Sequence, residues 1–190
     1  GGISMSAVAK LLQHEGVSLS GSDAEDSEFT RELVKRGIRV FSGHAAEHLP
    51  EETDLLLYSS AVPESNPERV EARKRGVREL TNFQFLGEWS EERRVALVCG
   101  THGKSTTTAL LGLMLAEAGE DPTVLVGSRV PSFPDKNLRV GSSRLAVIEG
   151  DEYERHFLEF KPQLVILNNI ELDHTDIYPS LEAMQEAFRE

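Results

Sequence analysis

The chain has 190 residues, 39% of them hydrophobic, which fits one large or two small soluble domains. Its formal net charge of −12 and the lack of a basic stripe argue against nucleic acid as a partner. No apolar run approaches a membrane span, no signal peptide opens the chain, and the single cysteine, Cys99, allows no internal disulfide, so we expect a cytoplasmic protein without a membrane partner.

The first half of the sequence repeats a helix that ends at a glycine and is followed by a β-branched residue. Apolar spacing predicts helices over residues 4–15, 28–36 and 67–75, each stopped by a glycine in a left-handed cap. Strands are predicted at residues 17–19, 38–41 and 54–58. Because residues 54–58 are almost continuously apolar, we expect them to be buried on both faces of a parallel sheet. The alternation predicts a doubly wound α/β domain.

A polar segment at residues 88–92 predicts a domain boundary, with one domain over 1–90 and a second over 91–190. The second domain is predicted to contain a helix over residues 104–118, apolar almost all round and therefore buried between layers. Residues 131–137 are expected to form a loop, and Ser180 to cap a last helix over 180–190. The strands are predicted at residues 94–99, 123–126, 145–148 and 164–167. Both ends look cropped, so we expect a fragment.

The segment VALVCGTHGKSTTT, residues 95–108, is typical of a nucleotide phosphate loop between a strand and a helix. Backbone amides and the positive end of the helix would receive the phosphates. Lys104 would reach the outer phosphates, and the Ser105 hydroxyl would ligate a bridging Mg²⁺. Only two residues separate Gly100 from Gly103, whereas the general pattern has four between its glycines. The segment favours a protein that uses a nucleoside triphosphate.

The opening of the chain has the layout of a dinucleotide fold. Gly1 and Gly2 precede the first helix, and Asp23 follows the next strand about twenty residues later, where an acid can bind a ribose or base. Ser4 stands where a further glycine would help, so the fingerprint is incomplete and an NAD-binding domain remains an alternative. Asp23 could equally form an Asx turn.

Acidic and imidazole side chains follow two of the later strands. The segment Glu149-Gly150-Asp151-Glu152-Tyr153 comes after one strand, and carboxylates suit Mg²⁺, although acidic turns are as common. His174 comes after the next strand, where a lone histidine is usually structural. Because parallel strands bring their carboxyl ends to one edge, Lys104, Glu149 and His174 are expected on the same side of the sheet.

Several of these segments resemble the Mur ligases, the ATP-dependent amino-acid-adding enzymes of peptidoglycan synthesis. GTHGKSTTT resembles their compressed ATP loop, EGDEY their EADEY pattern, and NNIELDH their TNIEADH pattern. The opening GGISMS, then SGSD, Gly43-His44, Ser59-Ser60-Ala61-Val62 and Asn66-Pro67-Glu68 resemble, in order, the branch that adds L-alanine to UDP-N-acetylmuramate. No lysine occurs in residues 175–190, where other branches carry a carbamylated lysine, which also favours this branch.

The resemblance implies a Rossmann-like domain for the UDP-sugar, part of a P-loop ATPase-type domain, and a C-terminal amino-acid-binding domain that is absent here. It implies that the muramyl carboxylate takes the γ-phosphate of ATP and that L-alanine then displaces phosphate. Lys104, Glu149 and His174 would be the catalytic residues, and Ser105, Glu149 and His174 the Mg²⁺ ligands. The implied ATP-binding residues are Gly100, Thr101, His102, Gly103, Lys104, Ser105 and Thr106. The implied UDP-sugar-binding residues are Gly2, Ser4, Asp23, Ser59, Ser60 and His102.

Alternatives remain open at this point. Without the family, Ser59 and Ser60 are more simply a turn at the end of a strand, and His44 and His48 more simply surface or capping residues. A murein tripeptide recycling ligase has similar motifs, and an NAD-dependent dehydrogenase fragment or a nonenzymatic nucleotide-sensing module belongs to other classes. The fragment alone is expected to be inactive. The amino acid added and the oligomeric state cannot be obtained from the sequence.

Overall fold

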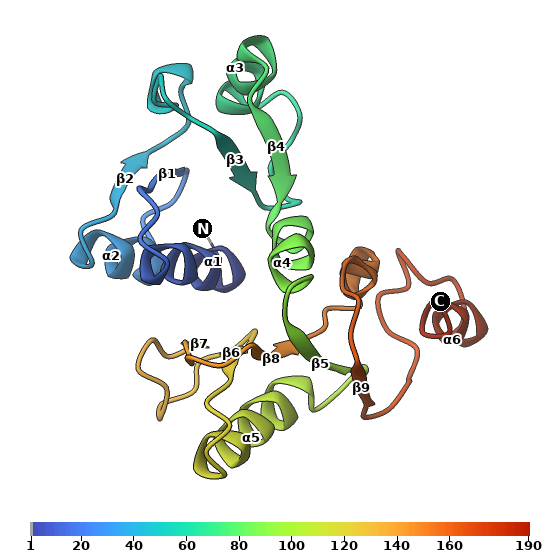
Figure 1. Cartoon of the computed structure of the whole chain (residues 1–190). Coiled ribbons are helices and arrows are strands. Elements are labelled where there is room, and N and C mark those ends of the chain that lie inside the picture. The colour runs from blue at the N-terminus through green and yellow to red at the C-terminus, as the bar shows by residue number, and fades with distance from the viewer. Residues whose placement is uncertain (1) are drawn as a thin grey trace. The chain divides into compact units, whose positions relative to one another are not determined.

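A computed structural model describes residues 2–190, so Gly1, the first glycine of the predicted phosphate turn, lies outside the described residues. The chain divides into two compact units, one ending at Phe85 and the other covering Leu86–Glu190. The division falls inside helix α4 (Asn82–Ser90), an element that the sequence pattern did not predict. Both units are mixed α/β structures that contain parallel strands, and Figure 1 labels their elements.

The first unit pairs its strands in two separate parallel ladders. Strand β1 (Ser20–Asp23) pairs with β2 (Arg39–Ser42), and β3 (Leu55–Tyr58) pairs with β4 (Arg78–Thr81). The connecting helical elements are α1 (Ile3–His14), α2 (Glu28–Lys35), the 3₁₀ helix η1 (Ala46–His48) and α3 (Pro67–Arg75). The three predicted helices of this half are therefore confirmed to within one residue at each end.

The residue after each helix-ending glycine closes the helix, and this corrects the predicted strand starts. Val17, Ile38 and Val77 each donate a backbone hydrogen bond to the carbonyl five residues earlier, at 2.9–3.1 Å, which is the Schellman arrangement. Each strand then begins one or more residues later. The predicted strand at residues 17–19 is wrong for this reason, and β1 begins at Ser20.

Strand β3 is only half-buried along its whole length, so the expectation of burial on both faces is also wrong. Its ladder partner is β4, which follows it through α3, and it forms the edge of a two-stranded ladder. An apolar run therefore located the strand correctly but overestimated the number of layers packed around it.

The second unit contains a five-stranded sheet in the order β7-β6-β8-β5-β9. The predicted strands are confirmed, whereas the two-residue strand β7 was not predicted. All neighbouring pairs are parallel except β6 and β7, which are antiparallel. The strands are β5 (Arg94–Cys99), β6 (Thr123–Leu125), β7 (Leu138–Arg139), β8 (Leu145–Glu149) and β9 (Leu164–Leu167).

Buried side chains of β5, β6 and β8 form the core of this sheet, with Val98, Val124 and Val147 fully buried. Helix α5 (Lys104–Glu117) packs against this core and lies along one face of the sheet (Figure 1). A Cβ at Gly112 would lie 2.6 Å from a Val124 methyl, so helix and sheet approach closely there. On the helix, Leu110 and Met114 are 55% and 68% exposed, so the prediction that α5 is buried all round is wrong.

The remaining elements follow the strands of the sheet. The 3₁₀ segment η2 (Tyr153–Glu159) comes after β8, and α6 (Leu181–Ala187) begins after Ser180, whose hydroxyl accepts a hydrogen bond from Ala183 N–H at 3.2 Å. The predicted serine cap is confirmed. Within residues 2–190, no helix has both the length and the apolar character that crossing a membrane requires.

Candidate functional site

The loop between β5 and α5 contains two glycines with positive φ. Gly100 and Gly103 have φ values of +125° and +80°, and residues with a side chain adopt such values only with strain. A Cβ at Gly100 would lie 2.8 Å from the Asn169 carbonyl oxygen, so the first glycine is also required by a close approach of backbone to backbone. The compressed spacing of the two glycines is therefore accommodated by this local geometry.

The segment after β9 holds this loop by hydrogen bonds at two successive loop positions, Thr101 and His102. Thr101 N–H donates to the Asn169 carbonyl at 3.2 Å, and His102 N–H donates to Asn169 Oδ1 at 2.9 Å. The Thr101 hydroxyl donates to the Glu171 carbonyl and accepts from Glu171 N–H, both at 2.9 Å. Asn168 Nδ2 donates to the His102 carbonyl at 3.1 Å. Sequence reasoning assigned a role in this segment only to His174 and missed these positioning residues.

Lys104, the first residue of α5, turns back over the loop. Its ammonium donates to the carbonyls of Gly100 at 2.8 Å and Thr101 at 3.1 Å, and to Glu152 Oε1 at 2.9 Å. The side chain is 14% exposed. The lysine that sequence analysis expected at the outer phosphates thus lies over the glycine loop, with its ammonium bound to two carbonyls of that loop and to Glu152.

Ser105 and Glu149 are in direct contact. The Ser105 hydroxyl donates to Glu149 Oε1 at 2.8 Å, and Gly127 N–H donates to Glu149 Oε2 at 2.6 Å. Glu149 is the last residue of β8, and Gly127 follows β6, its neighbour in the sheet. Two predicted metal ligands from different elements therefore meet at the carboxyl edge of the sheet, and Gly127 is a third participant that the sequence did not reveal.

His174 contacts a different carboxylate. Its Nε2 lies 3.4 Å from Glu152 Oε1, and its ring packs edge-on against Tyr153 with the ring centroids 5.1 Å apart. No contact joins His174 to Ser105 or Glu149 among the interactions of residues 2–190, and in that range no three His, Cys, Asp or Glu side chains form a group that could hold a metal ion alone. Glu152 brings His174 to Lys104, a link that sequence analysis did not assign.

The other predicted loop residues face outward. His102 is exposed, with Nε2 3.8 Å from a Glu171 carboxylate oxygen, and Thr106 is exposed on the first turn of α5. Among the side chains of residues 2–190, none caps the N-terminus of α5 or that of α1, which begins after Gly2. Helices α2, α3 and α6 each carry a side-chain cap. The two helices predicted to receive phosphates are thus without a cap hydrogen bond from the described side chains, whereas α2, α3 and α6 have one.

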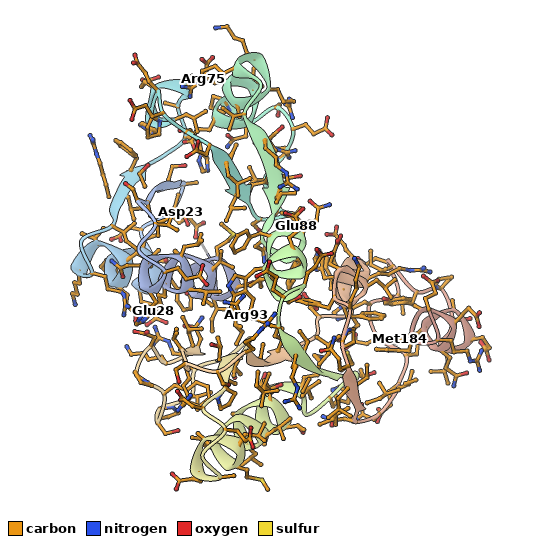
Figure 2. The ribbon with its side chains drawn as sticks, in the orientation of Figure 1. Asp23, Glu28, Arg75, Glu88, Arg93 and Met184 are labelled. Carbon is orange, nitrogen blue, oxygen red and sulfur yellow. The ribbon has the colours of Figure 1, made fainter. Side chains whose placement is uncertain are left out.

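In the first unit, Asp23 and Ser59 take part in local turns, whereas Ser4 contacts a residue far along the chain. Asp23, which Figure 2 labels on the first unit, ends β1 and accepts a hydrogen bond from Glu25 N–H at 2.9 Å, the Asx turn that was the alternative for this residue. Ser59 Oγ accepts from Ala61 N–H at 3.4 Å in a turn after β3, and Ser60 is exposed. The Ser4 hydroxyl accepts from Asn82 Nδ2 at 2.7 Å.

A hollow of about 330 Å³ lies beside Asp23, between α2 and the ends of β1 and β2. Its lining includes the charged side chains of Glu25, Asp26, Arg31 and Lys35, together with Phe41. Its position at the carboxyl ends of two parallel strands is the usual place for a ligand in an α/β sheet.

A cluster around Glu68 joins three segments of the first unit. The Glu68 carboxylate accepts a hydrogen bond from the Ser22 hydroxyl at 2.8 Å and lies 3.7 Å and 3.4 Å from Nδ1 of His44 and His48. The two histidines are not simply surface residues, because their side chains are 28% and 18% exposed. Ser22, His44 and Glu68 come from the SGSD, Gly-His and Asn-Pro-Glu segments, which the fold brings together.

Cys99, directly before the loop, is buried as a strand residue, as the sequence predicted. Burial raises the pKa of its thiol to about 12, and the negative charge of Glu152 acts in the same direction. The thiol is therefore protonated and unreactive in the folded chain at neutral pH.

Comparison with known proteins gives matches over nearly the whole chain. The model of the "Mur ligase family, catalytic domain" matches residues 1–94, and that of the "Mur ligase middle domain" matches residues 98–190. The UDP-N-acetylmuramate–L-alanine ligase of Salinibacter ruber is 43% identical over 189 residues, which is 99% of this chain and 39% of that protein. The corresponding ligase of Myxococcus xanthus is 40% identical over 190 residues and 40% of its length.

Solved structures are similar as well. The UDP-N-acetylmuramate–alanine ligase of Thermotoga maritima matches with a TM-score of 0.87 and 34% identity, over 100% of this chain and 44% of that one. The UDP-N-acetylmuramate:L-alanyl-gamma-D-glutamyl-meso-diaminopimelate ligase of Neisseria meningitides matches with a TM-score of 0.88 and 30% identity, over 99% of this chain and 64% of that one. The chain spans about two fifths of the length of the curated relatives it matches.

Proposed function

Because the chain belongs to the Mur ligase family, we propose that it is part of an ATP-dependent ligase that joins L-alanine to the carboxylate of UDP-N-acetylmuramate in peptidoglycan synthesis. The observation that carries this proposal is the meeting of Lys104, Ser105 and Glu149 at the carboxyl edge of one sheet, directly around the glycine loop. The reaction would pass through an acyl phosphate, formed when the carboxylate takes the γ-phosphate of ATP and ADP leaves. The amine of L-alanine would then displace inorganic phosphate to give an amide.

In this proposal the two units have different ligands. The first, with a Rossmann-like arrangement up to about residue 90, binds the UDP-sugar through Gly2, Ser4, Asp23, Ser59 and Ser60. The hollow beside Asp23 and the uncapped start of α1 support this assignment. The second, from about residue 91, is a P-loop ATPase-type domain that binds ATP through residues 100–106, and His102 faces the muramyl group.

The Ser105–Glu149 pair fits Mg²⁺ by its chemistry. Both side chains offer hard oxygen donors, and Mg²⁺ in nucleotide sites usually takes one or two protein ligands and completes its shell with phosphate oxygens and water. Two adjacent oxygens are therefore enough, although no larger cluster exists among the described side chains. When bound, Mg²⁺ supplies charge neutralisation for the transferred phosphoryl group. His174 would join this site only by leaving its contact with Glu152.

The chain's own groups would act mainly by position and charge. Lys104 exchanges the carbonyls of Gly100 and Thr101 for phosphate oxygens, and the free amides at the start of α5 bind the same anion. Glu149, fixed by hydrogen bonds to both of its oxygens, presents a defined carboxylate. In phosphoryl transfer such positioning accounts for most of the catalysis, because the transition state needs little covalent help from the protein.

A murein peptide ligase is the second candidate, because the fold matches the ligase from Neisseria meningitides as well as it matches the L-alanine-adding enzyme. The curated relatives favour the L-alanine branch at 40–43% identity over the whole chain. The NAD-binding alternative gains nothing from the family matches, since both are to Mur ligase domains.

A phosphate-release assay on the whole protein tests the proposal. ATP, Mg²⁺ and UDP-N-acetylmuramate are supplied with a panel of single amino acids, or with a murein tripeptide in place of the amino acid. Release that depends on L-alanine supports the proposed function, and release that depends on the tripeptide supports the second candidate. If neither acceptor stimulates phosphate release above ATP alone, the assignment fails.

A further inference from the structure

We propose that Glu152 is a positioning residue, whose carboxylate fixes Lys104 of the phosphate loop and His174 of the segment after β9 at one point. The contacts stand independently of the function proposed above, and only the consequence for phosphoryl transfer rests on it. The family resemblance implies no individual role for Glu152, whose contacts in the fold link Lys104 to His174.

The carboxylate lies between two cationic or potentially cationic groups from different elements. Lys104 Nζ is 2.9 Å from Oε1, to which it donates a hydrogen bond, and 2.8 Å from Oε2. His174 Nε2 is 3.4 Å from Oε1. The Glu152 side chain is 4% exposed, whereas Lys104 and His174 are 14% and 32% exposed. The charge is thus buried beneath the two groups that line the edge of the sheet.

One oxygen of this carboxylate retains unused capacity. Oε2 is buried and has no well-oriented hydrogen-bond donor among residues 2–190, although the ammonium of Lys104 is close. A buried carboxylate oxygen without a hydrogen bond is unfavourable and is seldom kept without a reason. The three N–H donors of the Lys104 ammonium are already used by the Gly100 carbonyl, the Thr101 carbonyl and Oε1, so Oε2 holds the ammonium by charge alone.

The main chain at Glu152 is fixed by hydrogen bonds, and these determine where the side chain begins. The hydroxyl of Tyr178, a fully buried residue, donates to the Glu152 carbonyl at 2.6 Å, and Arg155 N–H donates to the same oxygen at 3.0 Å. Tyr178 N–H in turn donates to the His174 carbonyl at 2.8 Å. The residue that carries the carboxylate and the residue that carries the imidazole are therefore fixed to each other through Tyr178.

This arrangement gives Lys104 two kinds of partner. The carbonyls of Gly100 and Thr101 belong to its own loop, whereas Glu152 comes from the turn between β8 and η2 and supplies a full negative charge. Without that charge, the ammonium would have only loop carbonyls to compensate its partial burial, and it would turn toward solvent. Glu152 thus holds the Lys104 side chain over the loop, in a position from which its ammonium can exchange the loop carbonyls for a phosphate oxygen.

Competitive labelling of lysines tests the positioning directly and needs no activity. The chain is trace-acetylated with acetic anhydride near neutral pH, and the rate at Lys104 is compared with that at the exposed Lys161 by mass spectrometry. In Glu152→Gln, which keeps the size of the side chain, we expect Lys104 to react about tenfold faster relative to Lys161, because a charge-assisted hydrogen bond is lost. The NMR signals of the His174 ring should shift in the same variant.

Glu154→Gln is the matched control, since it neutralises an exposed carboxylate two residues away whose ion-pair partner is His156. It should leave both Lys104 labelling and the His174 signals unchanged. Glu152→Asp keeps the charge but is one methylene shorter, and should give an intermediate rate. Circular dichroism confirms the fold of each variant. An unchanged Lys104 rate in folded Glu152→Gln overturns the proposal.

Kinetics of the whole protein separate positioning from a merely structural role. Glu152→Gln should lower kcat about tenfold or more with a smaller change in the KM for ATP, because misplacing Lys104 affects the transition state most. Equal kcat values for Glu152→Gln and the wild type would contradict the role in the reaction. If the wild type itself releases no phosphate with any acceptor, the proposed function fails, and the labelling result still decides whether Glu152 positions Lys104.

Discussion

Gly127 and Glu149 are in direct contact, since Gly127 N–H donates a hydrogen bond to Glu149 Oε2 at 2.6 Å. A Cβ added at Gly127 would lie 3.1–3.2 Å from three atoms of that carboxylate. With the Ser105 hydroxyl on the other oxygen, both oxygens of Glu149 are oriented by the protein. The absence of a side chain at Gly127 therefore determines where the carboxylate lies.

Gly127→Ala tests this relationship. The added methyl should push the Glu149 carboxylate aside by a few tenths of an ångström, and the Mg²⁺ concentration for half-maximal phosphate release should rise about 10- to 100-fold, as for other changes next to metal ligands. Mg²⁺ titrations of the whole protein measure it. Ser128→Ala, at the next position, is the control and should titrate like the wild type. An unchanged Mg²⁺ requirement in Gly127→Ala would show that the carboxylate has room to adjust.

Lys104→Ala should leave the whole protein nearly inactive. Loss of a preorganised charge contact of this kind costs roughly 3–4 kcal/mol, or a factor of about 10² to 10³ in rate. Steady-state phosphate release measures the effect, and Lys161→Ala, at an exposed lysine paired with Glu91, serves as the control. Retention of more than about a tenth of the activity in Lys104→Ala is incompatible with its proposed role.

Gly100→Ala should destabilise the second unit through two separate effects. The φ of +125° strains any side chain, and the Cβ would collide with the Asn169 carbonyl at 2.8 Å. Gly119→Ala isolates the first effect, because Gly119 has a φ of +86° with nothing within 4 Å of its Cβ position. We expect Gly119→Ala to cost about 1 kcal/mol and Gly100→Ala about 1–3 kcal/mol more in urea unfolding. Equal costs would mean that the loop can move away from Asn169.

Cys99 should resist thiol reagents in the native chain and react fully after denaturation in guanidinium chloride. Burial raises its pKa from 9.0 to about 12, so the folded state keeps the proton that the unfolded state loses. The associated stabilisation is complete below pH 9.0 and is lost as the pH rises toward 12. Reaction with a chromogenic disulfide measures accessibility, and Lys161→Cys supplies an exposed thiol for comparison. Rapid native labelling of Cys99 would disprove its burial.

Asp121 should stabilise the turn that joins α5 to β6. The hydroxyl and amide of Ser142, and then the Arg139 guanidinium, hold the pKa of this carboxyl well below its usual 3.8. A lowered folded-state pKa means that the stabilisation is present above pH 3.8 and is lost as the pH falls below it. Asp121→Asn should therefore lower the Tm at neutral pH, by an amount that shrinks in acid. Glu120→Gln is the control, and a Tm difference independent of pH would exclude the charge as the cause.

The sequence predicted the elements well where local chemistry determines them. The glycine after each helix, the Ser180 cap and the apolar strand before the Gly100–Gly103 loop each express a preference within a few residues, and each is found in the structure. The strand starts after Gly16 and Gly37 were misplaced because the β-branched residue there closes the helix rather than opening the strand. Helix α4 was missed because the polar segment at residues 88–92 was interpreted as a domain boundary, although residues 88–90 form the end of the helix, and residues 82–87 were assigned to no element.

The site was predictable only as far as parallel strands share an edge. That rule placed Lys104, Glu149 and His174 on one side, but it could not tell which carboxylate each would meet. Glu149, the last residue of β8, pairs with Ser105, and Glu152, three residues later, pairs with Lys104. The directions of these two side chains decide the pairing, and the sequence of this short segment does not reveal them. The backbone partners of the loop at Asn169 and Glu171 lie about 70 residues away in the chain, so only the fold brings them into view.

The hydrogen bonds between the loop and Asn168, Asn169 and Glu171 have a mechanical consequence. The turn that would cradle a triphosphate and the stretch that leads to His174 behave as one piece, since neither can shift by an ångström without breaking bonds to the other. A ligand that displaces the turn would therefore displace the segment that carries the His174 imidazole as well. Loss of the contacts of Asn169, a residue far along the chain from Lys104, would therefore loosen the loop itself, and with it the nucleotide binding proposed for this loop.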